Sequence, residues 1–198
     1  MNQVPLNNGH PSPTLIIGGA YCGKSDMAID FLQHNLKTCV VGTADNKDPV
    51  FQKRIDALKN MRPDHWRTFE DNENLSEMMS KLCLTHDQIL LDSINQWVAS
   101  RIVNGSSKYS TTQIEEHLFF ETDLIIKAIK SSPKTRFFLL SNEVNSGMVP
   151  PSSVPQLYRQ LLTRINCKFA NICQNVTTIT AGIPVVIKGP KTTQGQAQ

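Results

Sequence analysis

Short apolar runs alternate along the chain with longer segments in which apolar residues recur every three to four positions. The first pattern is typical of strands buried on both faces of a sheet, and the second is typical of amphipathic helices. The apolar runs predict strands at 15–17, 37–43, 89–92, 136–141, 176–180 and 184–187. The other segments predict helices at 26–36, 49–60, 75–84, 113–130 and 154–174, with one more beginning near Ser93.

This alternation predicts an α/β fold, in which a mostly parallel sheet is covered by helices on both faces. Pro184 has no N–H group to donate, so the last strand is expected at an edge of the sheet. Ligands of such sheets bind beyond the carboxyl ends of the strands. Gly18 and Asp92 are both expected to lie there.

The two ends of the chain differ in composition from its centre. Residues 1–13 are polar and proline-rich, and residues 189–198 hold few apolar side chains, so a flexible arm and a flexible tail are expected. The 198 residues fit one domain, predicted to span 14–188. The first residues do not show the pattern of a secretory signal, and no apolar run approaches the roughly 20 residues of a membrane span.

The composition is that of an ordinary globular protein, with 39% hydrophobic residues, 19% charged residues and a net charge of +3. The lysines and arginines do not cluster, which argues against a nucleic-acid partner. The five cysteines and five histidines lack metal-ligand spacing, which argues against a zinc site. Unpaired thiols are typical of a reducing compartment, so a cytoplasmic protein is expected.

The most specific chemical pattern is the stretch GGAYCGKS, which follows a predicted strand and matches G-x-x-x-x-G-K-[ST]. Backbone N–H groups of such a loop, and the amino end of the helix after it, bind phosphate oxygens. Lys24 adds a charge near the outer phosphates, and Ser25 offers a hydroxyl to Mg²⁺. The pattern predicts a P-loop NTPase-like fold and a nucleotide-binding protein, most simply a phosphotransferase. The alternative is a glycine turn that precedes an amphipathic helix by chance.

Asp92 ends an apolar strand and is the second candidate for the site. A carboxylate in this position orients Mg²⁺ or its water shell in phosphoryl-transfer proteins. The alternative is that Asp92 caps the helix that begins near Ser93.

Further blocks make the chain resemble, almost from end to end, the family of adenosylcobinamide kinase/adenosylcobinamide-phosphate guanylyltransferases. Beside the loop, these blocks are VVGTA at 40–44, RI at 54–55, RPDHWRTFE at 62–70, LLD at 90–92 followed by Trp97, NEVNSGMVP at 142–150 and AGIP at 181–184. The resemblance implies that ATP or GTP phosphorylates the hydroxyl of the cobinamide aminopropanol arm. GMP is then transferred from GTP to that phosphate through a covalent histidine intermediate. It also implies a homotrimer.

The resemblance assigns roles to particular residues. The phosphates are held by Gly18, Gly19, Ala20, Tyr21, Cys22, Gly23, Lys24 and Ser25. Further nucleotide contacts fall at or beside Gly42, Thr43, Ala44, Arg62, Glu70 and Asp92. The expected catalytic residues are Lys24, Asp92 and Glu143, and the expected Mg²⁺ ligands are Ser25 and Asp92. Glu143 is either a base for the acceptor hydroxyl or a residue that holds its loop by hydrogen bonds.

The departures from the family pattern concern the nucleophile. The family histidine lies between the Arg-Ile and Arg-Pro pairs, where this chain has Ala57 and Leu58. His65 is nearby, but its place beside Trp66 favours packing over a role as substitute nucleophile.

Other departures concern the phosphates and the last helix. Tyr21 and Cys22 replace the usual arginine and serine of the loop, and Asn145 and Gln156 replace a usual glycine and arginine, although Arg159 remains. The departures predict a cobinamide kinase whose guanylyltransferase step is impaired or lost. The alternatives are a nucleotide-binding homologue without turnover and a P-loop kinase of another small alcohol.

The trimer interface is not visible in the sequence. Apolar residues of the helix at 113–130, such as Leu118 and Phe119, are candidates for it, although core packing is the more frequent use of such a stripe.

Overall fold

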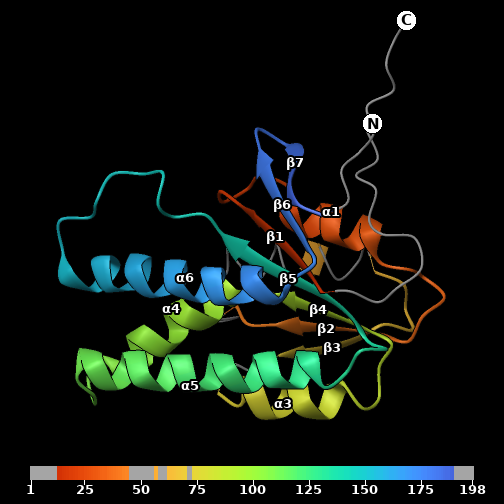
Figure 1. The fold of residues 1–198 in the computed structure, drawn as a ribbon, viewed down its shortest axis with the longest axis horizontal. Coiled ribbons are helices and arrows are strands. Elements are labelled where there is room, and N and C mark those ends of the chain that lie inside the picture. The colour runs from red at the N-terminus through yellow and green to blue at the C-terminus, as the bar shows by residue number, and fades with distance from the viewer. Residues whose placement is uncertain (1–12, 45–55, 58–61, 71–72, 190–198) are drawn as a thin grey trace, which may run out of the picture.

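The computed structural model describes residues 13–44, 56–57, 62–70 and 73–189. Over these residues the chain forms one seven-stranded sheet in the order β3-β2-β4-β5-β1-β6-β7 (Figure 1). Neighbouring strands are parallel except β6 and β7, which are antiparallel. The strands are β1 Thr14–Gly18, β2 Thr38–Gly42, β3 Arg67–Glu70, β4 Gln88–Asp92, β5 Arg136–Asn142, β6 Asn175–Thr180 and β7 Ile183–Lys188.

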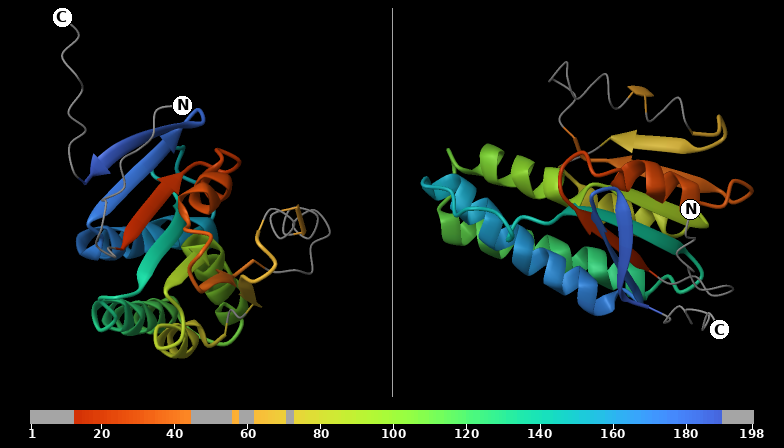
Figure 2. Two further views of the ribbon diagram at one scale, coloured as in Figure 1. Left: turned by 90° about the vertical axis from the view of Figure 1, so that its right-hand side faces the viewer. Right: turned by 90° about the horizontal axis from the view of Figure 1, so that it is seen from above.

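Helices cover both faces of this sheet, as the alternation of elements predicts. The helices are α1 Lys24–Phe31, α3 Leu75–Leu82, α4 Ile94–Gly105, α5 Thr111–Lys130 and α6 Ser153–Ile172. α1 lies on one face, and α3, α5 and α6 lie on the other (Figure 2). Among the described residues, no helix is long and apolar enough to cross a membrane.

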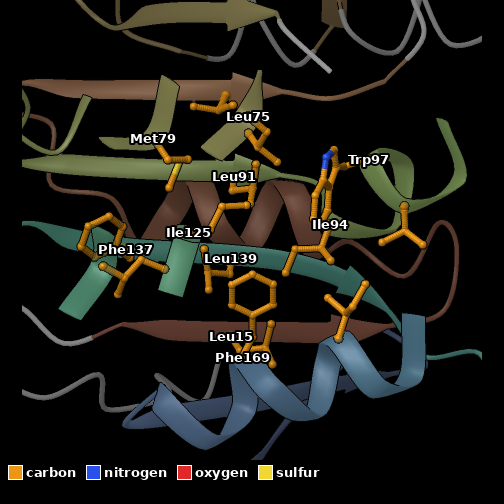
Figure 3. Packing of buried hydrophobic residues seen from close by; sticks show 14 of the residues in the cluster. Leu15, Leu75, Met79, Leu91, Ile94, Trp97, Ile125, Phe137, Leu139 and Phe169 are labelled. Carbon is orange, nitrogen blue, oxygen red and sulfur yellow. The ribbon is translucent and has the colours of Figure 1, made fainter. Parts of the chain in front are cut away.

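Two apolar clusters hold the layers together, because successive residues of a strand point to opposite faces. On β1, Leu15 joins the cluster under α3, α4, α5 and α6, whereas Ile16 joins the cluster under α1. On the larger side, Phe169 lies next to Leu15 and Trp97 lies next to Ile94 (Figure 3). The central strands are apolar on both faces for this reason, which is why they read as continuous apolar runs.

Most predicted elements are confirmed within a few residues of their predicted ends. Both strand positions near the carboxyl terminus are confirmed, and β7 is an edge strand as the proline at 184 predicts. The predicted helix at 26–36 is too long: α1 ends at Phe31, where Leu32 turns to an extended backbone while its side chain stays buried under α1. The apolar side chain of Leu32 therefore continued the helical pattern without continuing the helix.

Strand β3 is absent from the predictions. Its four residues are exposed or half-buried and include one apolar side chain, Phe69, so the sequence has no apolar run at this position. The helix predicted at 49–60 falls outside the described residues, except that 56–57 are helical. The predicted arm at 1–13 and the predicted tail at 189–198 also fall outside them, except for residues 13 and 189.

The candidate interface residues on α5 are used mainly for packing. Leu118 is completely buried in the core. Phe119 is half-buried, and its ring lies under the Arg164 guanidinium of α6 at 4.3 Å. The neighbouring Phe120 is the exposed aromatic residue of this turn, with 62% of its surface accessible.

Candidate functional site

Most of the predicted site residues lie at one edge of the sheet, where the parallel strands have their carboxyl ends. Gly18 pairs with Asn142 of β5 and Ile179 of β6, and Gly42 pairs with Asp92 and Glu70. Strand β5 lies between β1 and β4, so the ends of those two strands are two strand spacings, or about 10 Å, apart.

The phosphate loop begins at a glycine that tolerates no side chain. A Cβ atom at Gly18 would lie 2.7 Å from Cys22 Sγ and 2.8 Å from the Ile179 carbonyl oxygen, both too close for any real contact. At the other end of the loop, Gly23 has a φ of 89° and precedes the first residue of α1. Glycine adopts this left-handed conformation without strain. The glycines at 18 and 23 are therefore required by the shape of the loop.

Lys24 is the charged group of this loop, and only 8% of its surface is exposed. Its Nζ donates to the carbonyl oxygens of Gly18 at 3.1 Å and Gly19 at 2.6 Å, and contacts Cys22 Sγ at 3.7 Å. The ammonium is thus held over the loop backbone, beside the amino end of α1. Ser25, 6% exposed, follows in the first turn of that helix.

The residues between the two glycines form an exposed tip. Gly19 and Ala20 are exposed, and Tyr21 is 77% exposed with a φ of 59°. Cys22 is half-buried, with its sulfur over Gly18. An anion that approaches the loop meets these residues at the surface and Lys24 beneath them.

The site has two halves: the phosphate loop after β1, and the group of residues at the ends of β2, β3 and β4. Thr43 positions the second half. It is completely buried, and its Oγ1 donates to the Ser93 carbonyl oxygen at 2.6 Å and accepts from the Ser93 N–H at 2.9 Å. Its own N–H donates to the Asp92 carbonyl oxygen at 3.0 Å. The Thr43 hydroxyl therefore holds the backbone next to Asp92, and its expected contact with nucleotide stays a prediction. Ala44 follows, half-buried.

Asp92 ends β4 at the site edge and is half-buried. Ser93, in extended conformation, is the N-cap residue of α4, so the alternative in which Asp92 caps that helix is wrong. The negative charge of the Asp92 carboxylate instead interacts with the positive charge of the Arg62 guanidinium. Burial lowers the pKa of the Arg62 guanidinium, and the negative charges of Asp92 and Glu70 oppose that shift. The structure thus brings Arg62, Glu70 and Asp92 together, as the resemblance implies.

Glu143 follows β5 and lies directly beside the phosphate loop. Its N–H donates to the Gly18 carbonyl oxygen at 3.1 Å, and its Oε1 accepts from the Asn145 N–H at 2.6 Å. Of the two roles predicted for Glu143, the second hydrogen bond supports holding the loop. The role as a base stays a prediction, and it is compatible with this position because a base must lie near the transferred phosphoryl group.

The nearby His65 is exposed and makes a hydrogen bond, whereas the histidine ring that packs against Trp66 is that of His34. His65 Nε2 lies 2.8 Å from the His34 carbonyl oxygen, and the His34 ring packs edge-on against Trp66 with ring centroids 5.7 Å apart. Ala57 is exposed, and Leu58 lies outside the described residues.

The residues present fit Mg²⁺ bound together with a nucleotide. The Ser25 hydroxyl and the Asp92 carboxylate are oxygen ligands, which Mg²⁺ prefers, and protein sites for Mg²⁺ on nucleotides use one or two such groups plus phosphates and water. No cluster of three or more acidic, histidine or cysteine residues that could hold a metal occurs in the part of the chain that the structure describes. Ser25 and Asp92 therefore suit a metal that is coordinated mainly by the nucleotide phosphates more than a metal site made entirely of protein ligands.

Sequence reasoning missed one buried polar contact that supports the site. Asn166 of α6 donates from Nδ2 to the Asn142 carbonyl oxygen at 3.0 Å and accepts from Ser141 Oγ at 2.6 Å. The sequence signal that could have found this contact is a polar residue on the apolar stripe of α6, between Ile165 and Phe169. Asn166 is 8% exposed in the structure. A buried amide needs partners. The contact fixes the end of β5 next to Gly18.

Comparison with solved structures identifies the fold alone. An ATPase from the type III secretion system of pathogenic bacteria superposes with a TM-score of 0.53 and 12% identity, over 87% of this chain and 53% of that one. A protein from Pyrococcus horikoshii OT3 superposes with a TM-score of 0.50 and 10% identity, over 92% of this chain and 88% of that one. The fold is P-loop NTPase-like, as the loop predicts.

Comparison with known sequences identifies relatives of similar length. The bifunctional adenosylcobalamin biosynthesis protein CobU of Escherichia coli is 27% identical over 179 residues, which is 88% of this chain and 98% of the relative. CobU of Salmonella typhimurium is 28% identical over 88% of this chain and 98% of the relative. CobP of Pseudomonas aeruginosa, with the same description, is 27% identical over 88% and 96%.

The family model described as cobinamide kinase/cobinamide phosphate guanyltransferase matches residues 14–187. This match covers the whole sheet except its last residue, and it includes both halves of the site. The chain therefore belongs to the cobinamide kinase/cobinamide phosphate guanyltransferase family.

Proposed function

We propose that this chain transfers the terminal phosphoryl group of ATP or GTP to the hydroxyl of the cobinamide aminopropanol arm. The observation that carries the proposal is the place of Lys24, whose ammonium is buried over the phosphate loop on the same sheet edge as Asp92. The family description names cobinamide kinase, which supports the choice of acceptor. The P-loop NTPase-like fold supports the choice of donor.

The reaction forms one phosphorus–oxygen bond and breaks another. The acceptor hydroxyl oxygen attacks the γ-phosphorus, the bond to the bridging β–γ oxygen breaks, and the nucleoside diphosphate leaves with the electron pair. The hydroxyl proton passes to Glu143, which lies next to Gly18. Catalysis of such transfers rests on positioning and charge stabilisation.

The charges that this stabilisation needs come from both halves of the site. Lys24 and the N–H groups at the amino end of α1 bind the outer phosphates. Ser25 and Asp92 would hold Mg²⁺, which would supply further positive charge to the phosphates. Arg62, placed by Glu70 and Asp92, offers a cation on the β2–β4 side for the rest of the nucleotide.

We infer further that the guanylyltransferase step is lost. Transfer of GMP through the enzyme needs a side chain that attacks the α-phosphorus. Ala57 and Leu58 carry hydrocarbon side chains where the family has its histidine. His65 lies outside the family position of the nucleophile, and its Nε2 is engaged at the His34 carbonyl oxygen, which supports the loss of this step.

A nucleotide-binding protein without turnover is the second candidate. It is favoured by Tyr21 and Cys22, which remove one positive charge from the loop relative to the family pattern. In either case, family resemblance alone supports a homotrimer, and the unpaired thiols support a place in the cytoplasm. Sedimentation analysis of the purified chain tests the trimer.

Two labelled nucleotides separate these functions. With adenosylcobinamide and γ-labelled ATP or GTP, we expect label in the acceptor. With α-labelled GTP, we expect no acid-labile label on the protein. Failure to label the acceptor while nucleotide still binds would favour the non-catalytic candidate.

An acid-labile GMP adduct on the protein would show that a nucleophile persists. The His65→Ala variant, assayed in parallel, then decides whether His65 carries the adduct. The phosphorylation of adenosylcobinamide is expected to be the same in this variant as in the parent chain.

A further inference from the structure

The loop at residues 143–152, which joins β5 to α6, begins next to the end of β1 and extends towards the amino end of α6 (Figure 1). Its first residue, Glu143, donates its N–H to the Gly18 carbonyl oxygen at 3.1 Å. Lys24 Nζ donates to the same oxygen at 3.1 Å. The β5–α6 loop is therefore joined to the phosphate loop through one shared acceptor atom.

Helix α6 holds the β5–α6 loop at two points. Arg159 donates from Nη2 to the Asn145 carbonyl oxygen at 2.8 Å and from Nε to Asn145 Oδ1 at 3.3 Å. Gln156 donates from Nε2 to the Pro150 carbonyl oxygen at 2.8 Å. The loop is thus fixed near its beginning and near its end, and the residues between the two anchors form its tip.

The tip of this loop is apolar and open to solvent. Met148 is 95% exposed and Val149 is 67% exposed. Large apolar side chains that stand together on a surface, next to a functional site, mark contact with an apolar partner. Methionine suits such contacts because its unbranched thioether adapts to irregular surfaces.

The sheet order decides which substrate this tip meets. Strand β5 lies between β1, which carries the phosphate loop, and β4, which carries Asp92. The loop after β5 therefore begins between Lys24 and the Mg²⁺ carboxylate, at the place of the outer phosphate. The acceptor hydroxyl must approach that phosphate. A triphosphate is highly charged, so an apolar tip complements the acceptor and not the donor.

We propose that Met148 and Val149 bind the apolar surface of the hydroxyl acceptor, and that Arg159 is a positioning residue that holds the β5–α6 loop, and with it these two side chains, in place. The acceptor must carry a hydroxyl on an arm and a broad apolar ring surface. This inference rests on the proposed function, in which the acceptor is cobinamide, a large ring molecule with such an arm.

The test is steady-state kinetics of the full chain with adenosylcobinamide and ATP, on the variant Met148→Ser combined with Val149→Ser. We expect the KM for adenosylcobinamide to rise about tenfold, the lower end of the range for lost apolar contacts. The KM for ATP and the kcat at saturating acceptor stay unchanged. Leu84→Ser is the matched control: Leu84 is 85% exposed but lies before β4, at the opposite edge of the sheet.

Arg159→Ala tests the positioning role. It is expected to raise the KM for adenosylcobinamide, with no change in the KM for ATP and no change in the thermal midpoint. Arg164→Ala, in the same helix, removes an arginine that pairs with Glu115 of α5 and leaves the loop anchors intact. This control is expected to leave both KM values unchanged. A mere loss of stability would raise neither KM selectively.

Three outcomes overturn the inference. The first is an unchanged KM for adenosylcobinamide in the serine double variant. The second is an equal rise in the KM values of both substrates. The third is a change of oligomeric state in sedimentation with an unchanged KM, which would make the tip a contact between copies of the chain.

Failure of the proposed function is separable from failure of this inference. If the parent chain does not phosphorylate adenosylcobinamide, equilibrium dialysis followed by the absorbance of the corrin ring measures binding directly. Binding that weakens about tenfold in the serine double variant supports the loop as the recognition element, even without turnover. Equal binding by both proteins, or no binding at all, overturns it.

Discussion

Two glycines end parallel strands at the same edge of the sheet, but their surroundings differ. A Cβ at Gly18 would lie within 2.8 Å of both Cys22 Sγ and the Ile179 carbonyl oxygen, whereas a Cβ at Gly42 would first meet Glu70 Cγ at 3.6 Å. The end of β1 is closed by backbone and small groups, and the end of β2 is lined by charged side chains. The first region depends on shape, and the second depends on hydrogen bonds and charge.

The largest effect is expected from Gly18→Ala. The added methyl group must displace the Ile179 backbone or the sulfur of Cys22, which distorts the loop that binds phosphates. Overpacking of this kind costs about 1–3 kcal/mol of the free energy of unfolding. We expect nucleotide binding, measured by calorimetry, to fall below detection.

Matched glycine variants sharpen this prediction. Gly19→Ala places its Cβ in open space, and Gly42→Ala makes only an ordinary contact at 3.6 Å. Both are expected to bind nucleotide within about twofold of the parent chain, because tolerated substitutions usually change a free energy by about 0.5 kcal/mol or less. If Gly18→Ala binds as well as these variants, shape does not distinguish the two regions.

Lys24→Ala is expected to have the next largest effect. It removes the buried ammonium while leaving the glycines of the loop in place. Loss of a preorganised charge at a phosphoryl-transfer site lowers kcat by about 10²–10³-fold. The kinase assay measures this loss, and Lys168→Ala, which removes an exposed lysine paired with Asp123, is the control. A kinase activity that survives in Lys24→Ala would remove Lys24 from the proposed site.

Thr43→Val tests the second region. The variant keeps the shape of the side chain but leaves the Ser93 N–H without its buried partner. The Ser93 carbonyl oxygen loses the Thr43 hydroxyl but still accepts from the Trp97 N–H at 3.2 Å. Unsatisfied buried groups cost about 1–3 kcal/mol each, so the free energy of unfolding in denaturant is expected to fall by about 2 kcal/mol. Activity falls as well, since Asp92 adjoins the released backbone. Thr43→Ser keeps the hydroxyl and should remain close to the parent chain in both measurements.

The smallest effect is expected from the pH dependence of stability at His86. This residue lies beside Phe69 of β3, with ring centroids 6.1 Å apart. Burial lowers the pKa of His86 below its ordinary value of 6.5, and the charges of Lys37 and Arg67 add to this shift. Below pH 6.5 the unfolded chain takes up a proton before the folded chain does, so stability falls as the pH drops through 6.5 towards the folded pKa.

Replacing the imidazole tests that pH dependence. His86→Asn keeps a polar group next to Thr85, whose Oγ1 lies 2.9 Å from His86 Nδ1, but it does not titrate. Thermal midpoints at pH 7 and pH 5 are expected to differ less in this variant than in the parent chain. An equal difference in both proteins would show that other groups set the acid sensitivity.

The local pattern of apolar and polar residues was enough to predict the central strands and the longest helices. β4 and β5 are apolar on both faces and α5 and α6 are amphipathic over five turns, so their signals are strong. β3 escaped detection because a short edge strand needs few apolar residues. The end of α1 was misplaced because Leu32 is buried whether or not its backbone is helical.

The sequence by itself determined most of the phosphate loop, because the bonds of Lys24 and the turn at Gly23 are local, although the Ile179 carbonyl oxygen also closes the space at Gly18. Lys24 bonds to carbonyl oxygens five and six residues away, and Gly23 adopts its left-handed conformation within the same turn. Eight consecutive residues therefore encode the loop and the chemistry that it supports.

Only the tertiary structure decided what faces that loop. The insertion of β5 between β1 and β4 brings Glu143 to Gly18 across more than a hundred residues, and the buried Thr43 hydroxyl meets Ser93 across fifty. Periodicity reports whether a residue is buried and in which type of element. Strand order, in contrast, depends on how all the helices pack over both faces of the sheet, which no local stretch of sequence contains.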